Sequence, residues 1–197
     1  MRLVLVIVMI GSFGIVLYPF WPLVRYEVSP PKAEDTVFFP KFPATPIAQE
    51  SRDVLKEGIE EERRGNRLLI PKIGVDIAVV EGVNEKSALS RGAWLIPNTS
   101  TPDKGSNTVL SAHRFRYVPP HSETFYLLDK LTVGDTLQVF WEGREYRYRV
   151  FASKVVSAEA TDVLNGTPNS SLTLVTCSPL FSTKERLIVS GELMEVL

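Results

Sequence analysis

Three residues with complementary chemistry stand at the ends of apolar runs. The single cysteine, Cys177, ends the strand-like run SLTLVTC, and after an eight-residue loop the run RLIVSGEL begins with Arg186. A third run, NTVLSAH, ends at His113. A loop between antiparallel strands returns the chain beside itself, so we expect the thiol and the guanidinium to face one pocket. A thiol, an imidazole and a fixed cation are the minimum set for acyl transfer through a thioester.

The protonation states of such a site limit its rate. A thiolate attacks the peptide carbonyl, a protonated imidazole gives its proton to the leaving amine, and the arginine stabilises the oxyanion. With ordinary pKa values of about 8.5 for cysteine and about 6.5 for histidine, each required form is about a tenth populated at about pH 7.5. The joint population is then about 1%, so we expect a slow enzyme unless the site shifts these values.

Each of these residues also has an ordinary structural interpretation. Cys177 can be a small buried apolar side chain, His113 a structural histidine, and Arg186 a solubilising charge on a strand edge. The second histidine, His121, lies in the segment PPHS and is expected to be an exposed bystander in a surface loop. The three residues together favour catalysis more than any one of them does, because all three stand at strand ends.

The composition excludes several classes of protein. The 197 residues contain 22 Lys plus Arg and 23 Asp plus Glu, with a net charge of −1 and a pI near 6.2. This balance lacks the basic footprint of a nucleic-acid-binding protein, so we expect no nucleic acid as a partner. One cysteine excludes an intramolecular disulfide, and with two histidines it excludes the usual zinc clusters. The length fits one domain with a further segment attached.

The N-terminal 25 residues are predicted to form a transmembrane anchor. No charged residue occurs from Leu3 to Val24, a run that would span about 30 Å as a helix, the thickness of the hydrocarbon core of a bilayer. Tyr18 and Trp21 suit the membrane interface. A cleaved signal peptide is the alternative, but the run is long for one and no clear cleavage site follows. Arg2 favours a single-pass protein with a cytoplasmic N-terminus and an extracytoplasmic domain in the cell membrane.

Residues 26–64 are predicted to connect this anchor to the domain. Five prolines between residues 28 and 46 favour an extended stalk. Residues 47–64 carry scattered apolar residues among many charges, which predicts a short amphipathic helix.

Residues 65–197 have the pattern of a mainly β domain. Short β-rich runs are separated by turn signals, which favours a closed or nearly closed barrel. Glu142 and Gly143 predict a hairpin turn, and residues 165–168 a loop. Residues 84–91 and 123–130 are each expected to form one or two helical turns.

The segment TLVTCSPLFSTKERLIV at 173–189 resembles the active-site segment of sortases, with a TLxTC strand end and an arginine nine positions after the cysteine. Three further stretches resemble the family in the same order: LLIPKIGVDIAVVEG, GSNTVLSAHR at 105–114 and VGDTLQVFWEGREYRYRV at 133–150. The resemblance implies an eight-stranded sortase barrel with short helices. It also implies Cys177 as nucleophile, His113 as general acid and base, and Arg186 as the residue that stabilises the oxyanion or positions the substrate.

The family implies a reaction and its partners. Sortases cleave a sorting signal such as Leu-Pro-x-Thr-Gly through a cysteine thioester and pass the acyl group to an amine of the cell envelope or of a protein. The TCxPxxSxxxRLIV pattern is closest to classes D and E, and no Asp-Pro-aromatic lid of the pilin class occurs in the stalk. Ala112 replaces the glycine that usually precedes the catalytic histidine. We expect Thr176, Leu180, Phe181 and Tyr117 to contact the substrate.

The sequence predicts no metal and no cofactor. Asp76, Glu81 and Glu85 are the nearest candidates for calcium ligands, but they fall in ordinary strand and turn positions.

Two other functions stay open at this point. A thiol peptidase would release the acyl group to water, and a catalytically silent barrel would only bind extended peptides. The silent barrel predicts that Cys177→Ala leaves function intact, whereas both enzymes predict near-total loss.

Overall fold

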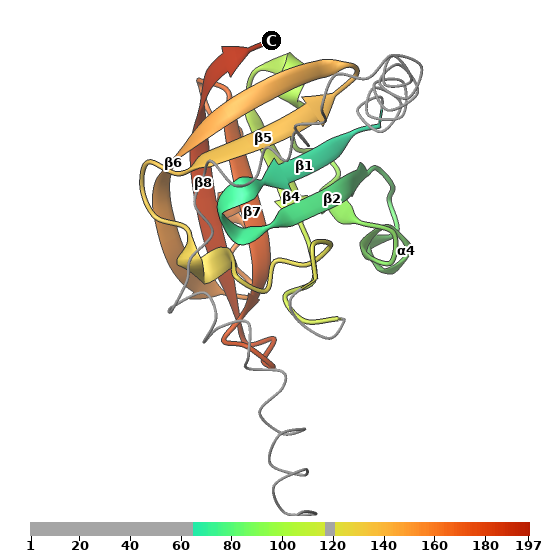
Figure 1. Ribbon diagram of the computed structural model, residues 1–197. Coiled ribbons are helices and arrows are strands. Elements are labelled where there is room, and N and C mark those ends of the chain that lie inside the picture. The colour runs from blue at the N-terminus through green and yellow to red at the C-terminus, as the bar shows by residue number, and fades with distance from the viewer. Residues whose placement is uncertain (1–64, 117–120) are drawn as a thin grey trace, which may run out of the picture.

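A computed structural model of the protein describes residues 65–116 and 121–197, and these form a closed β-barrel (Figure 1). The barrel order is β1-β2-β3-β4-β7-β8-β6-β5. This confirms the mainly β, closed eight-stranded barrel. The strands are β1 (Arg67–Ile70), β2 (Val75–Val80), β3 (Ala93–Leu95), β4 (Asn107–Ser111), β5 (Thr136–Trp141), β6 (Arg144–Ser157), β7 (Ser171–Ser178) and β8 (Glu185–Val196).

The pairing directions determine which strand ends meet. β2 pairs with β3 and β4 pairs with β7 in parallel, whereas the other neighbours are antiparallel. Parallel neighbours need a long connection, and here β5 and β6 lie between β4 and β7 in the chain. As a result the carboxyl ends of β4 and β7 lie side by side. In Figure 1 the chain leaves both strands at the lower end of the barrel.

Strand β7 is buried on both faces. Leu172 and Leu174 lie in the main core cluster inside the barrel, together with side chains of all the other strands. Val175 instead packs with Val109 and Ile188 in a second cluster. Successive side chains of a strand point to opposite faces, so the second cluster lies on the outer face of the barrel.

Most of the predicted local elements are present. The helix α4 (Glu85–Leu89) begins after Asn84, whose Oδ1 accepts a hydrogen bond from Ser87 N at 2.9 Å. Residues 123–130 contain only one turn of 3₁₀-helix, η5 (Leu128–Lys130). The other 3₁₀ turns are η3 (Pro71–Ile73), η4 (Pro102–Lys104) and η6 (Asp162–Leu164).

The two predicted connections also have the expected form. Glu142 and Gly143 join β5 to β6 with φ values of 48° and 79°, as a two-residue hairpin turn of type I′ requires. Residues 165–168 lie in the loop between η6 and β7.

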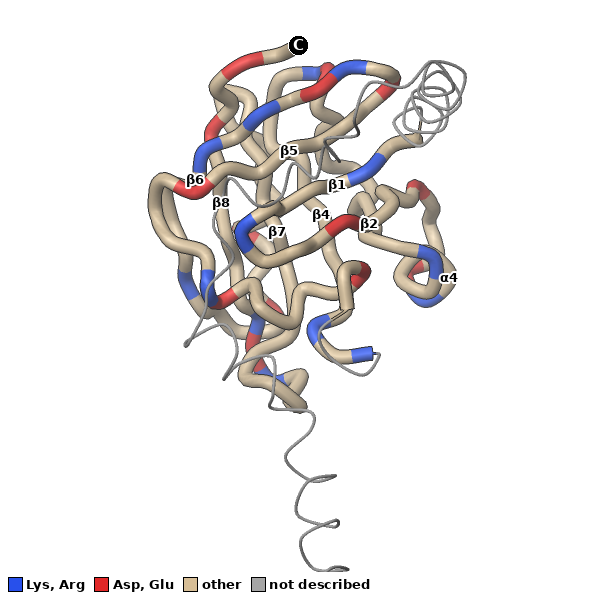
Figure 2. The backbone as a smooth tube through the Cα atoms, viewed as in Figure 1, with Lys and Arg blue, Asp and Glu red and all other residues tan. Residues whose placement is uncertain are grey.

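Charges of both signs are distributed over the described part of the chain (Figure 2). Several form ion pairs between neighbouring segments: Arg67 with Asp76, Lys72 with Asp135, Arg114 with Asp129, Arg147 with Glu145 and Glu195, and Lys154 with Asp162.

The predicted anchor at 1–25, the stalk and the amphipathic helix at 47–64 lie outside the described residues. Within residues 65–116 and 121–197, no helix is both long and apolar enough to cross a membrane.

We expect the interior of β7 to be required for stability. Leu174 is 0% exposed, so Leu174→Ala removes buried apolar volume and leaves a cavity. The free energy of unfolding should fall by about 2–5 kcal/mol, measured by urea denaturation. Val155→Ala is the control, because Val155 is 52% exposed and its truncation should change the free energy by less than about 0.5 kcal/mol. Equal losses in the two variants would contradict this account of the core.

Candidate active site

Cys177 and Arg186 face each other across two neighbouring strands. The antiparallel register of β7 and β8 pairs Cys177 directly with Arg186. The strands extend slightly further than predicted, because β7 continues through Ser178 and β8 begins at Glu185. The connection is therefore six residues, 179–184, rather than the expected eight. Because the strands extend this far, Cys177 and Arg186 both lie within the paired strands and not in the loop.

His113 lies on the other side of Cys177. Strand β4 ends at Ser111, so His113 is two residues beyond the strand and not its last residue as predicted. The parallel register pairs Ser111 with Val175, and Ala112 N donates to Val175 O at 3.2 Å. Thr176 Oγ1 donates to Ala112 O and Arg114 Nη1 donates to Cys177 O, so the segment that carries His113 lies against the end of β7 that holds Cys177. Phe125 N donates to His113 O at 2.9 Å and fixes the backbone there.

Cys177 on β7, Arg186 on β8 and His113 just after β4 form a group that we call the catalytic row. Neighbouring strands are about 4.8 Å apart, so the backbone of Arg186 flanks the backbone of Cys177 at this spacing. Cys177 is two residues from Val175 and therefore shares its outer face. The thiol is half-buried. The catalytic row thus brings the thiol of Cys177, the imidazole of His113 and the guanidinium of Arg186 to one partly exposed surface.

The environment of His113 favours its neutral form. Partial burial lowers the pKa of the imidazole below its usual 6.5, and the nearby charge of Arg116 lowers it further, while Glu85 acts in the opposite direction. A neutral imidazole is suited to accept the thiol proton. The imidazolium that donates to a leaving amine is correspondingly scarce at neutral pH.

Arg186 is held by its own loop. Its Nη1 donates to Thr183 O at 2.8 Å and to Glu185 O at 3.0 Å. A guanidinium has five donors in a fixed fork, so these contacts orient the group while other donors can still be directed to a substrate oxygen.

The Thr176 hydroxyl has a structural partner. Thr176 is 2% exposed, and its Oγ1 donates to Ala112 O at 2.8 Å. This bond joins β7 to the residue before His113, at the position where Ala112 replaces the usual glycine. The side chain therefore connects the two catalytic segments, and a contact of Thr176 with substrate stays a prediction.

Arg114 is a site residue that the sequence analysis did not single out. Its Nη1 donates to Cys177 O at 3.3 Å, and its Nη2 contacts Asp129 Oδ1 at 2.8 Å. The side chain of Arg114 is only 11% exposed. The arginine thus joins the backbone of Cys177 to η5. Its place directly after His113 in GSNTVLSAHR was the available signal, but sequence cannot show that it reaches β7.

The other predicted substrate contacts differ in position. Phe181 is 62% exposed and has a φ of 65°, and its ring lies edge-on to Phe115 with centroids 4.7 Å apart. This pair joins the loop after Cys177 to the segment after His113, next to the catalytic row. Leu180 instead packs against the main core cluster. Tyr117 lies outside the described residues.

His121 is not the exposed bystander that was expected. It is half-buried and lines a small cavity with Ile73, Gly74 and Tyr126, and its Nδ1 accepts a hydrogen bond from Glu123 N at 3.2 Å. Its neighbours make it a structural residue of this loop.

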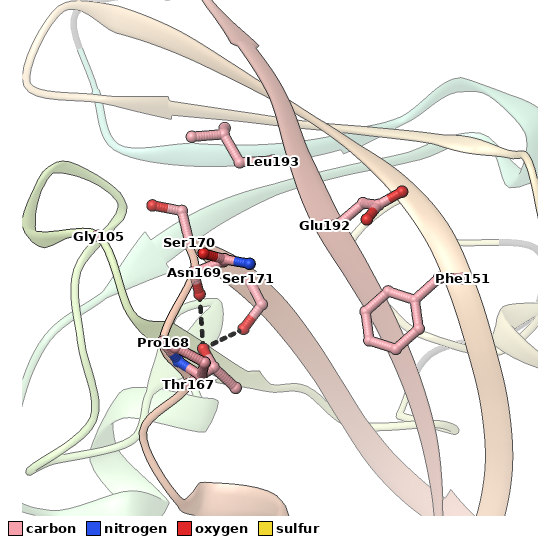
Figure 3. Close-up of a pocket in the computed structure, with 9 residues that line it drawn as sticks. All are labelled: Gly105, Phe151, Thr167, Pro168, Asn169, Ser170, Ser171, Glu192 and Leu193. Atoms are coloured by element: carbon pink, nitrogen blue, oxygen red, sulfur yellow. Dashed lines mark hydrogen bonds between the residues drawn. The ribbon is translucent and has the colours of Figure 1, made fainter.

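Among the described residues no metal cluster occurs, and one described cavity lies away from the catalytic row. In the described part of the chain, no three His, Cys, Asp or Glu side chains lie close enough to hold a metal ion. A cavity of about 640 Å³ lies at the far end of β7, between residues 167–171 and the β8 residues Glu192 and Leu193 (Figure 3). It is separated from Cys177 by most of the length of β7.

The geometry can now be compared with known proteins. A family model of the sortase domain matches residues 68–194. This chain belongs to the sortase family. Sortase SrtE1 of Streptomyces coelicolor is 33% identical over 70% of this chain, and Sortase D of Bacillus subtilis is 27% identical over 64% of it. Relatives named for classes D and E are thus among the matches, as the motif indicated. The matches span 43% and 61% of the lengths of these two relatives.

Solved sortase structures have the same fold. The crystal structure of Sortase E1 from Streptomyces coelicolor, with a tripeptide in its active site, matches with a TM-score of 0.60 and 30% identity over 68% of this chain and 90% of that chain. Sortase C-1 from Streptococcus pneumoniae matches with a TM-score of 0.59 and 33% identity over 68% of each chain.

We expect Arg116→Gln to raise the pKa of His113. The substitution removes a positive charge that opposes protonation of the imidazole, so the fraction of imidazolium at neutral pH should increase. The pKa can be measured by NMR titration of the histidine ring, with His121→Gln used to assign the signals. Arg147→Gln is the control, because Arg147 pairs with Glu145 and Glu195 on β6 and β8. An unchanged or lower pKa in Arg116→Gln would contradict this electrostatic account.

We expect Arg114→Met to impair both folding and acylation. The variant leaves Cys177 O without this donor and Asp129 without its ion pair, so the free energy of unfolding should fall by about 1–3 kcal/mol. Urea denaturation and the rate of thioester formation measure the two effects. Lys154→Met is the control, because its ion pair with Asp162 is long, at 3.8 Å, and exposed. If Arg114→Met changes neither quantity more than the control does, Arg114 has no positioning role.

Proposed function

We propose that this protein is a membrane-anchored sortase that attaches surface proteins to the cell envelope. It cleaves a sorting signal of the Leu-Pro-x-Thr-Gly type and transfers the acyl group from Cys177 to an amine acceptor. The observation that supports this most is the catalytic row, in which Cys177 on β7 is paired with Arg186 on β8 and lies next to the segment after β4 that carries His113. The family supports the same chemistry, because sortases are cysteine transpeptidases.

The steps follow from the row. Cys177 gives its proton to the neutral imidazole of His113, and its thiolate attacks the carbonyl before the scissile bond. Arg186 stabilises the oxyanion, and His113 donates a proton to the departing amine, which leaves a thioester on Cys177. In the second half, His113 takes the proton of the incoming amine as that amine attacks the thioester. An amide forms and the thiol is released.

The proposed location rests on the uncharged N-terminal run. Residues 3–24 contain no charged side chain and have the length of a bilayer-spanning helix. A domain outside the cell would then have its sorting-signal proteins and its acceptor amines in the same compartment.

Intact-mass spectrometry of the full-length protein in detergent can test this function. The protein is mixed with Leu-Pro-x-Thr-Gly or Leu-Ala-x-Thr-Gly peptides, with and without an added amine. We expect a thioester adduct that is absent in Cys177→Ala and that converts to an amide product when the amine is present. The rate should fall to background in Cys177→Ala, because no other residue can form the thioester.

Other outcomes separate the alternatives. An adduct that decays only to the free acid, whatever amine is added, would indicate a thiol peptidase. A folded protein that forms no adduct with either peptide and binds both of them would indicate a silent peptide-binding barrel. Protein that stays in the aqueous phase on detergent phase partitioning would contradict the proposed anchor.

A further inference from the structure

Asn107, at the start of β4, holds a distant loop on the outer face of the barrel. Its Nδ2 donates to Val163 O and to Asn165 O, both at 3.0 Å. Its Oδ1 accepts from Thr173 Oγ1 at 2.7 Å and from Ser171 Oγ at 3.4 Å. The residue is 4% exposed. Both donor hydrogens and both acceptor sites of this amide are therefore used.

Ser106 adds a second attachment beside the first. Its Oγ donates to Thr167 O and accepts from Thr167 N, each at 3.0 Å. Residues 162–167, which we call the η6 segment, are thus held against the start of β4 at residues 163, 165 and 167. Figure 3 shows Thr167 in this position, with its hydroxyl also bonded to Ser171 and to the backbone of Asn169.

The η6 segment covers the outer face close to the catalytic row. Val163 and Leu164 pack against the cluster of Val109, Val175 and Ile188. Val175 and Ile188 are paired with each other. On the outer face theirs is the pair next to that of Cys177 and Arg186. Residues two apart on a strand are about 6.6 Å apart, so the backbone of Val175, on which the η6 segment packs, is about 6.6 Å from that of Cys177.

We propose that Asn107 is a positioning residue for peptide acylation by Cys177. Asn107 fixes the position of the η6 segment on the outer face of the barrel. This segment forms one side of the site that binds an extended peptide beside the catalytic row, and we call it the wall. The inference rests on the proposed function, since it concerns how the peptide substrate is placed. Asn107 itself is paired with Ser171, which precedes Cys177 by three positions on the same face of β7. It therefore acts by holding the η6 segment and not by contact with the reacting atoms.

Only an amide fits this position. Two backbone carbonyls of the η6 segment need donors, while two hydroxyls of β7 need an acceptor. Asn107→Asp keeps the size but places an oxygen against the carbonyls of Val163 and Asn165. The resulting repulsion should release the segment while leaving the hydroxyl contacts of β7 in place.

The test compares two reactions of the same thiol in the full-length protein. Peptide acylation of Cys177 needs the wall, whereas alkylation by iodoacetamide needs only the thiol. In Asn107→Asp we expect acylation by the Leu-Pro-x-Thr-Gly peptide to slow by about 10- to 100-fold, the cost of a misplaced substrate. The alkylation rate should stay within about twofold. Hydrogen exchange should increase at the amides of residues 163–167.

Asn169→Asp is the matched control. It makes the same chemical change in the loop between the η6 segment and β7, at an exposed residue whose side chain makes no hydrogen bond to β4 among those described. Its acylation rate, alkylation rate and hydrogen exchange should all match the wild type. Val163→Ala provides a second test if Asn107→Asp does not fold, because it trims the wall and leaves the side chain of Asn107 in place. It should slow acylation several-fold without changing alkylation.

The outcomes separate this inference from the proposed function. Acylation by the wild type with an unchanged rate in folded Asn107→Asp overturns the positioning role alone. If Asn107→Asp is unfolded, an unchanged rate in Val163→Ala has the same meaning. Equal slowing of acylation and alkylation also overturns the role, because the thiol itself would then be disturbed. No acylation by the wild type overturns the proposed function and this inference together.

Discussion

The parallel pairing of β4 with β7 is the interaction on which the site depends. It brings together segments that are more than sixty residues apart in the chain, and it carries the segment that contains His113 to the end of β7 that holds Cys177. Hydrogen bonds from Ala112 N to Val175 O and from Thr176 Oγ1 to Ala112 O continue the pairing beyond the end of the strand. A slip of one residue would turn every side chain of the strand to the opposite face and remove His113 from the row.

Strand β7 serves stability and chemistry at the same time. Its inward side chains, Leu172 and Leu174, lie in the main core, and its outward side chains form the surface that leads to Cys177. Since both faces are packed, the thiol is carried by a rigid element, as precise positioning of a nucleophile requires. Arg114 adds a contact with the carbonyl of Cys177 itself.

Nearby charges set the protonation of His113, and packed loops surround Cys177. Partial burial and Arg116 keep the pKa of His113 low, which favours the base over the acid at rest. The rings of Phe115 and Phe181 join the two loops that carry the catalytic groups, and the η6 segment covers the outer face on the other side of Cys177. These groups come from three parts of the chain, at residues 115–116, 162–167 and 181. The groups around the thiol therefore come together only when the barrel has closed.

The sequence by itself determined the type of fold and the chemistry. Alternating apolar runs and turn residues predicted the strands, and Glu142-Gly143 predicted the hairpin, because these depend on local backbone preferences. The TLxTC segment with Arg186 indicated the family and its nucleophile. Only the tertiary structure decided that Arg114 contacts Cys177, that Leu180 enters the core, and that Asn107 holds the η6 segment. These contacts join segments tens of residues apart, and they depend on the strand register and barrel closure, which short-range patterns do not encode.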